Sequence, residues 1–401
     1  QVLESVLTPG FFDTPPAKNE MAEELDKILE RSGNIEDILV ATRRWANDRR
    51  FQVGVLSLLS TVDQEQAADS LSDIADNSIS ALYDKVEEEM ASQHGRIADS
   101  AMAILAMGKL GSREMTPESD LDLVFIYDMP ENSEASDGPK PLTPGHYFAR
   151  LGQRLINAIT AQTSEGDLYE VDMRLRPSGT AGPIASSIGS FLQYNDEDAW
   201  TWEQMALTRA RVINAPEQLE CKISAIIDKT LTRPRDGDAL LVDVADMRKR
   251  MLQTHRTDFI WDVKHIRGGL IDVEFIAQYL QLRHAHENPD ILNRQTRVAL
   301  EKLTVHGFLD PSIATDLIDA LNLWKSLQGM LRLTIPRELR KRREHEIPES
   351  LQEKLAKICQ VSDFTGLIEK MDQTAERVLG HFNTIVVEPA ARLNQTRETD
   401  T

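Results

Sequence analysis

A short apolar segment that begins with two carboxylates most strongly constrains the fold of this chain. The residues Asp120–Tyr127 have the pattern of a buried strand, and side chains along a strand alternate between its two faces. Asp120 and Asp122 therefore project from one face, and apolar side chains fill the other: Leu121, Leu123, Phe125 and Tyr127. Two neighbouring carboxylates repel each other unless a cation lies between them, and Mg²⁺ binds carboxylate and phosphate oxygens. The segment predicts a strand that carries a metal-nucleotide site.

A second segment repeats this arrangement. Strict alternation over Leu168–Arg176 predicts a strand with Glu170, Asp172, Arg174 and Arg176 on one face. The two guanidinium groups could hold phosphates or balance the acids. We therefore predict Asp120, Asp122 and Asp172 as the catalytic, metal-binding carboxylates, although a pair such as Asp120 and Asp122 could also be two solvated acids at a strand end.

A glycine-bearing turn precedes the first acidic strand. Glycines at positions 108 and 111 would let the backbone approach phosphates closely, and a following helix start would present amide donors. Lys109 could contact a triphosphate or could be a surface lysine. The predicted nucleotide-binding residues are Gly108, Lys109, Gly111, Ser112, Ser119, Arg174 and Arg176.

The overall pattern predicts an α+β fold that is mostly helical, with a small mixed β-sheet domain followed by a helical bundle domain. We expect a helical segment over residues 1–95, the sheet domain over 96–215, a helical domain over 216–390 and a polar, disordered tail over 391–401. Residues 129–145 read as a mobile loop and 146–163 as a helix. The mixed charges of 337–346 indicate a solvated helical face or a binding patch.

Composition narrows the class of protein. The net charge of −20 argues against a nucleic-acid partner, because phosphate neutralisation requires the opposite sign. Two distant cysteines exclude a disulfide framework and fit a reducing cytoplasm. No apolar run reaches membrane-spanning length, and the first residue, Gln1, suggests an excised fragment.

These motifs resemble those of a known family. Gly108-Lys109, Ser119-Asp-Leu-Asp122 and the later Asp172 resemble the polymerase-β-type nucleotidyltransferase signature, with lysine where most members have serine after the glycine. The resemblance is closest to bacterial glutamine synthetase adenylyltransferases, which often have glycine at the positions of Ser112 and Glu118. It runs through five blocks: Ala106–Met115, Ser119–Phe125, Tyr169–Gly179, Asp198–Val212 and Trp261–Phe275.

The resemblance implies transfer of AMP from ATP to a tyrosine of glutamine synthetase, with Mg²⁺ as cofactor and pyrophosphate as product. It also implies the PII signal protein and glutamine as regulators. The block around Trp200–Leu207 resembles the adenylylating, C-terminal half of these enzymes. The alternatives are the AMP-removing half, another nucleotidyltransferase such as a uridylyltransferase, or a non-catalytic helical regulator that docks glutamine synthetase or PII.

Further candidates lie outside the carboxylates. Glu203, Arg209 and Arg211 are expected in one helix with core tryptophans at positions 200 and 202, where Arg209 could brace the site or form a structural ion pair. Lys264 and Arg267 precede a helix with Asp272 and Glu274, and could face the active site or serve in capping and packing. The pair His284 and His286 does not have metal-ligand spacing for a helix.

Overall fold

The computed structural model describes Val6 and residues 10–257, 259–335 and 347–399, with side chains described to Gln395. The chain divides into two compact units. The first comprises residues 1–199 and 209–228, and the second comprises residues 200–208 and 229–401. Helix α9 (Glu217–Thr232) begins in the first unit and ends in the second.

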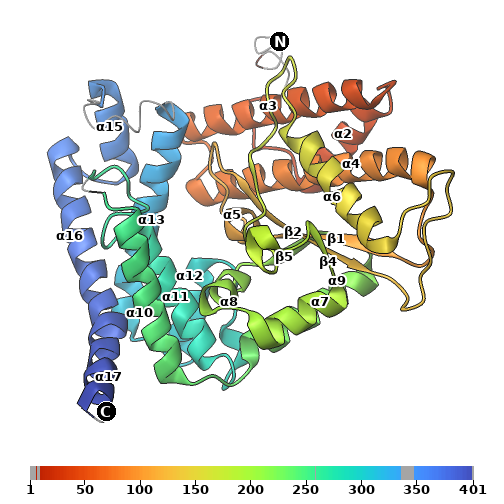
Figure 1. Ribbon diagram of the computed structural model, residues 1–401. Coiled ribbons are helices and arrows are strands. Elements are labelled where there is room, and N and C mark those ends of the chain that lie inside the picture. Colours follow the sequence, from red (N-terminus) through yellow and green to blue (C-terminus); the bar gives the residue numbers. More distant parts are fainter. Residues whose placement is uncertain (1–5, 7–9, 258, 336–346, 400–401) are drawn as a thin grey trace. The chain divides into compact units, whose positions relative to one another are not determined.

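The first unit combines long helices with a small sheet (Figure 1). Its elements in chain order are α2 (Lys18–Leu29), α3 (Ile35–Leu59), α4 (Gln64–His94), β1 (Ala101–Ala106), α5 (Gly108–Gly111), β2 (Leu121–Asp128), α6 (Pro144–Thr160), β3 (Val171–Asp172), the 3₁₀ turn η1 (Gly179–Ala181), β4 (Ala185–Ser187), α7 (Ile188–Gln193), the π-helical turn η2 (Tyr194–Asp198) and β5 (Arg211–Asn214).

The five strands form a mixed sheet in the order β3-β2-β1-β5, and β4 also pairs with β2. Strand β1 is antiparallel to β2 and to β5, whereas β2 is parallel to β3 and to β4. The predicted α+β class with a small mixed sheet is confirmed. The middle of β2 is buried on both faces, as expected for a central strand covered by helices.

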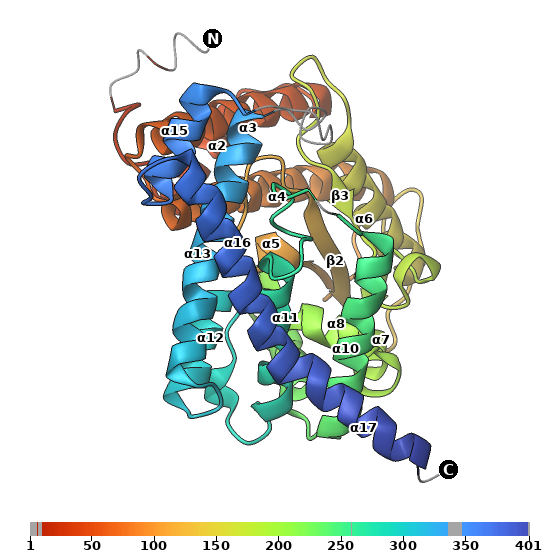
Figure 2. The ribbon, with the colours of Figure 1, turned by 90° about the vertical axis from the view of Figure 1, so that its left-hand side faces the viewer.

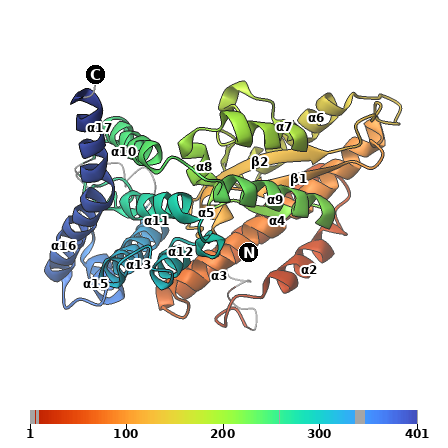
Figure 3. The ribbon, with the colours of Figure 1, turned by 90° about the horizontal axis from the view of Figure 1, so that it is seen from below.

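One hydrophobic core serves both the helices and the sheet of the first unit. It joins side chains of α2, α3, α4 and α6 to those of β1 and β2, and Figures 1 and 3 show these helices next to the sheet. Helix α4 begins with a capping box, in which the Asp63 carboxylate accepts a hydrogen bond from Gln66 N and the Gln66 side chain accepts one from Asp63 N. Its apolar residues then recur at helical spacing on the buried face, including Leu71, Ile74 and Leu82.

The second unit is helical. Its elements are α8 (Thr201–Leu207), α10 (Gly237–Thr254), α11 (Leu270–His284), the 3₁₀ turn η3 (Pro289–Ile291), α12 (Thr296–Val305), α13 (Pro311–Thr334), α15 (Glu349–Ile358), α16 (Phe364–Phe382), the π-helical turn η4 (Asn383–Val387) and α17 (Glu388–Thr399). Figure 2 shows α16 and α17 following one another along α10, α11 and α13. The apolar residues that recur along one face of α13 are buried from Leu317 to Leu331, whereas Ile313 is half-buried.

Several local expectations differ from the structure. The second acidic strand is two residues long, because the chain turns after Asp172, so Arg174 and Arg176 lie in turns. The polar tail expected to be disordered is helical to Thr399, since it continues α17. Strands β4 and β5 were not expected.

Two other expectations concern surfaces. Trp200 and Trp202, expected in the core, are 69% and 38% exposed. The charged segment 337–346 lies outside the described residues. Among the helices that the structure describes, none has the length and apolar character needed to cross a bilayer.

Candidate active site

The turn after β1 lies directly against the start of β2. Met107 N donates a hydrogen bond to Asp122 O at 2.9 Å, which joins the two segments. Gly108 follows with a φ of +52°, a conformation that favours glycine. A Cβ atom at Gly108 would lie 2.1 Å from Asp122 Oδ2. Glycine at this position therefore allows the backbone to pass immediately beside the carboxylate.

Two of the predicted carboxylates are brought together by strand pairing. In the parallel ladder between β2 and β3, Asp122 is the register partner of Asp172. Register partners on neighbouring strands project from the same face of a sheet. Asp120 immediately precedes β2 and is exposed. Asp122 and Asp172 thus lie side by side near the start of β2 and at the end of β3, and Asp120 directly precedes β2.

Arg174 neutralises part of this negative charge. Its side chain binds Asp172 with Nε–Oδ2 and Nε–Oδ1 distances of 2.8 and 3.0 Å, and Arg174 N donates to Asp172 Oδ1 at 2.8 Å. Partial burial raises the pKa of Asp172, but these hydrogen bonds outweigh it, so the pKa lies below that of an ordinary aspartate. Asp120, Asp122 and Asp172 all raise the pKa of Arg174. The guanidinium therefore acts as the counter-ion of the site.

The site has the chemistry of a cation-binding site, although its metal ligands are not assembled. No group of three or more potential His, Cys, Asp or Glu ligands is arranged for a metal ion within the described part of the chain. Magnesium usually takes one or two protein carboxylates and completes its shell with phosphate oxygens and water. Asp122 and Asp172 supply two carboxylates. The Arg174 side chain, which is 77% exposed and paired with Asp172, adds a positive charge beside them. The donor set fits Mg²⁺ bound together with a nucleotide.

A second turn, over Thr116–Ser119, lies just before Asp120 and β2. Thr116 N and Thr116 Oγ1 lie 3.0 and 2.9 Å from Ser119 Oγ, and Lys109 Nζ donates to Thr116 Oγ1 at 3.2 Å. Glu118 stands where the resembling family has glycine, and its φ is +58°. The turn thus keeps a left-handed residue at this position in spite of the substitution. The Ser119 and Lys109 side chains both bond within this part of the fold.

Ser112, Glu114 and Arg209 form a buried cluster behind the glycine turn. Arg209 Nη2 donates to Ser112 Oγ at 2.7 Å and to Glu114 Oε2 at 2.6 Å. All three side chains are buried. A Cβ atom at Gly111 would lie 2.0 Å from Arg209 O, so glycine is needed for this close packing. Arg209 therefore forms the structural ion pair that the sequence left as one of two alternatives.

Sequence reasoning missed a set of acids on α4 that also supports the turn. Asp76 is buried and binds Arg211 through both carboxylate oxygens, at 2.8 and 2.9 Å, and Arg211 Nη2 donates to Leu110 O at 3.0 Å. Arg113 binds Asp69 and Asp73 at 2.9 Å each. The spacing of 69, 73 and 76 puts these acids on one helical face, which is the signal that could have revealed them.

The remaining candidates have structural partners. Arg176 donates to Met173 O, Gly182 O and Thr180 O, and so holds the loop after β3. Arg209 and Arg211 were expected in a helix with Glu203, but α8 ends at Leu207, so Arg209 follows the helix and Arg211 begins β5. Glu203 accepts a hydrogen bond from Trp200 N and caps α8.

In the second unit, Asp272 is fully buried and organises the turn before α11. It accepts hydrogen bonds from Arg248 Nε and Gly268 N at 2.6 Å each, and Arg267 Nη1 lies 3.6 Å from it. Lys264 O accepts a hydrogen bond from Ile271 N at 3.3 Å. Packing thus accounts for Arg267. The ring of His284 stacks on Phe308, with centroids 4.4 Å apart, and His286 Nδ1 lies 3.1 Å from Arg283 O.

Models of known protein families match both the part of the chain that contains the site and the helical region. The family model described as glutamate-ammonia ligase adenylyltransferase matches residues 1–226, which include every carboxylate and turn residue of the site. A second model, described as GlnD PII-uridylyltransferase, matches residues 241–386.

Curated relatives match nearly the whole chain. The chain is similar to bifunctional glutamine synthetase adenylyltransferase/adenylyl-removing enzymes of three bacteria. The identity is 42% for Rhodopseudomonas palustris strain TIE-1, over 96% of this chain and 39% of the relative. It is 41% for Bradyrhizobium diazoefficiens and 38% for Xanthobacter autotrophicus, in each case over 96% of this chain and 38% of the relative. The chain spans about two-fifths of the length of these relatives.

Proposed function

The chain belongs to the glutamate-ammonia ligase adenylyltransferase family, and on that premise we propose that it transfers AMP from ATP to a tyrosine of glutamine synthetase and releases pyrophosphate. The observation that carries the proposal is the register of Asp122 with Asp172 beside Gly108. A nucleotidyl transfer needs paired carboxylates next to a backbone turn that phosphates can approach. The relatives' names give both adenylyl transfer and adenylyl removal as activities, and glutamine synthetase as the protein they act on.

Asp120, Asp122 and Asp172 would hold Mg²⁺ in this proposal. When bound, the ion would neutralise charge on the triphosphate and lower the pKa of a nearby hydroxyl. The carboxylates position the nucleotide and must carry negative charge to do so. The lowered pKa of Asp172 keeps that carboxylate ionised at neutral pH.

Asp172 is also the candidate to accept the tyrosine proton. A tyrosine hydroxyl has a pKa of about 10, so roughly one in a thousand is ionised at pH 7. A carboxylate with a lowered pKa is a weak base while it remains bound to Arg174. The Arg174 side chain is largely exposed, which leaves room for it to move from Asp172 to a phosphate. We propose that this exchange couples nucleotide binding to release of the base.

The other predicted nucleotide-binding residues divide by their environment. Gly108, Lys109 and Arg174 are proposed to contact phosphates, because they lie at the carboxylate edge of the sheet. Ser112 and Ser119 are buried, and Gly111 packs against Arg209, so we propose that these three residues shape the turns. Arg176 is proposed to hold the loop on which Arg174 stands.

The direction of the reaction rests on one block of sequence. The residues from Ala199 to Leu207 resemble the adenylylating half of the bifunctional enzymes, and we propose the PII signal protein and glutamine as its regulators on the same resemblance. The net charge of −20 favours a protein substrate over a nucleic acid, and we propose that the enzyme acts in the cytoplasm, where its substrates are.

An assay of both directions tests this assignment. Purified chain would be incubated with glutamine synthetase, magnesium and labelled ATP, and separately with adenylylated glutamine synthetase and phosphate. We expect label in glutamine synthetase in the first reaction and no phosphate-dependent release of AMP in the second. Release without transfer would identify the AMP-removing half instead.

A further inference from the structure

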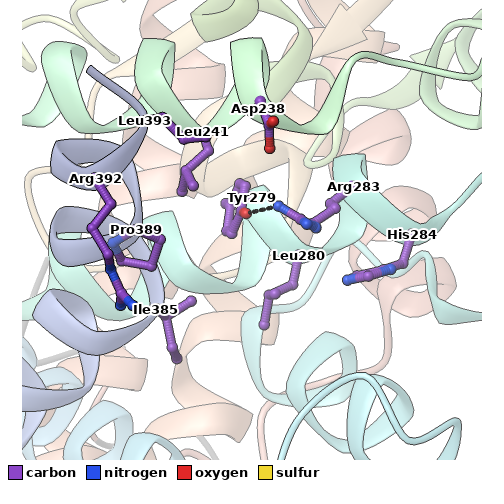
Figure 4. Close-up of a pocket in the computed structure, with 10 residues that line it drawn as sticks. All are labelled: Asp238, Leu241, Tyr279, Leu280, Arg283, His284, Ile385, Pro389, Arg392 and Leu393. Carbon is purple, nitrogen blue, oxygen red and sulfur yellow. Dashed lines mark hydrogen bonds between the residues drawn. The ribbon is translucent and has the colours of Figure 1, made fainter. Parts of the chain in front are cut away.

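A pocket in the second unit lies between α10, α11 and α17. It has a volume of about 470 Å³ and is open on one side, which falls within the range of small-molecule sites. Its wall includes the apolar side chains of Leu241, Leu280, Ile385 and Pro389. We call it the α10–α11–α17 pocket (Figure 4).

A guanidinium group stands on one side of this pocket. Arg283 Nη1 donates to the Tyr279 hydroxyl, and the group lies flat near Gly237, where a Cβ atom would be 3.6 Å from Arg283 Cζ. The contacts fix the guanidinium but use only one of its N–H donors among the described residues. A fixed fork with remaining donors is suited to bind a carboxylate.

A carboxylate faces the same pocket. Asp238 and Tyr279 both line the pocket, and the Asp238 side chain has no hydrogen-bond or ion-pair partner among the described residues. Figure 4 shows Asp238 and Arg283 on one side and Arg392 on the other, with the apolar side chains between. Burial lowers the pKa of His284, which favours the neutral form of its ring.

The lining charges define what the pocket can accept. The charged residues of the lining are Arg283, Arg392 and Asp238. Asp238 would repel a second negative charge placed next to the first. The apolar side chains provide contact area for a hydrocarbon body. We propose that the α10–α11–α17 pocket binds a small monocarboxylate with an apolar tail, whose carboxylate is held by Arg283.

Titration calorimetry on the full chain tests this site with 4-methylpentanoate as the probe. We expect saturable binding with a stoichiometry of one, and no binding of 4-methylpentanol or of inorganic phosphate at the same concentration. Phosphate binding as tight as that of the acid would replace the proposal with a general anion site. No saturable binding of the acid would overturn it.

Three variants locate the binding. Arg283→Gln should weaken binding by about 10-fold or more, because it removes a charge-assisted pair. Asp238→Asn should strengthen it and admit the dicarboxylate adipate, since the repelling charge is gone. Arg250→Gln, on an exposed arginine of α10 outside the pocket, is the matched control and should bind as the unmodified chain does. Unchanged binding by Arg283→Gln, or adipate binding tightly without the Asp238 change, would contradict the proposal.

Discussion

At the scale of single residues, Gly108 passes directly beside a carboxylate of the active site. Alanine there would place Cβ 2.1 Å from Asp122 Oδ2 and would have to keep a φ of +52°. The left-handed conformation alone costs about 1 kcal/mol. We expect Gly108→Ala to lower AMP transfer by about 100-fold, because the carboxylate must move, while circular dichroism shows a folded chain.

Gly145→Ala is the matched control for this change. Gly145 lies in the first turn of α6, and a Cβ atom there would meet no atom within 4 Å. The control should retain full activity. Equal activity of the two variants would show that the approach of Gly108 to Asp122 has no catalytic importance.

The pairing of Asp172 with Arg174 predicts a pH effect at the same scale. A lowered folded-state pKa means that Asp172 keeps its charge to a lower pH than a free aspartate. The pair therefore stabilises the fold above the unfolded-state pKa, and this contribution is lost as pH falls through the lowered folded-state value. Arg174→Gln removes the guanidinium hydrogen bonds and the positive charge but keeps the bond from the backbone N, so the pKa of Asp172 and the acid limb of the pH–rate profile should both move part of the way to higher pH.

Carboxyl NMR titration of Asp172 in both proteins provides the direct measurement. If the acid limb moves but the Asp172 resonance titrates as before, another group controls the rate. If neither changes, Arg174 does not set the ionisation of the site.

At the scale of elements, α4 holds the glycine turn through Asp76 and Arg211. Removing one partner of a buried ion pair costs about 3–5 kcal/mol, and Lys18 and Arg113 also lie near Asp76 and offset part of that cost. We expect Arg211→Gln to lower both the melting temperature and kcat, with Arg211→Lys restoring part of each. Leu110 O loses a hydrogen bond in the first variant, so the turn shifts.

An exposed ion pair between Glu87 of α4 and Arg96, which follows that helix, gives the control. Arg96 binds Glu87 at 2.8 Å with a 54% exposed side chain, and such pairs contribute about 0–1 kcal/mol. Arg96→Gln should leave kcat unchanged. If Arg211→Gln lowers the melting temperature but not kcat, the ion pair between Asp76 and Arg211 stabilises the fold and has no effect on catalysis.

The sequence predicted much at the element scale and failed where tertiary contacts decide. The continuous apolar run Leu123–Tyr127 correctly predicted the strand that contains Asp122, because a strand buried on both faces has such a run. Alternation overextended the second strand, since the bonds from Arg176 to Met173 O and Gly182 O turn the chain after Asp172. The burial of Ser112 beside Arg209 depends on residues almost a hundred positions apart and has no local signal.

At the scale of the whole molecule, the N-terminal helices and the sheet share one core in the first unit. Met21, Leu56 and Leu82 belong to the same buried cluster as Leu123 and Phe125. Deleting residues 1–95 would expose that apolar surface to water. We expect the shortened chain to lose cooperative unfolding and to aggregate, as seen by calorimetry and light scattering. A soluble, cooperatively folded product would show that the sheet is independent of the helices, as the division at residue 95 in the sequence analysis implies.

The central claim is that Asp120, Asp122 and Asp172, which lie at neighbouring ends of β2 and β3, carry out AMP transfer. It is tested most directly by measuring transfer of labelled AMP from magnesium-ATP to glutamine synthetase by the chain and by its Asp120→Asn and Asp122→Asn variants. The account predicts transfer by the unmodified chain, a loss of about 100-fold or more in each variant, and unchanged circular dichroism. Variants that fold and retain most of the magnesium-dependent rate would contradict it.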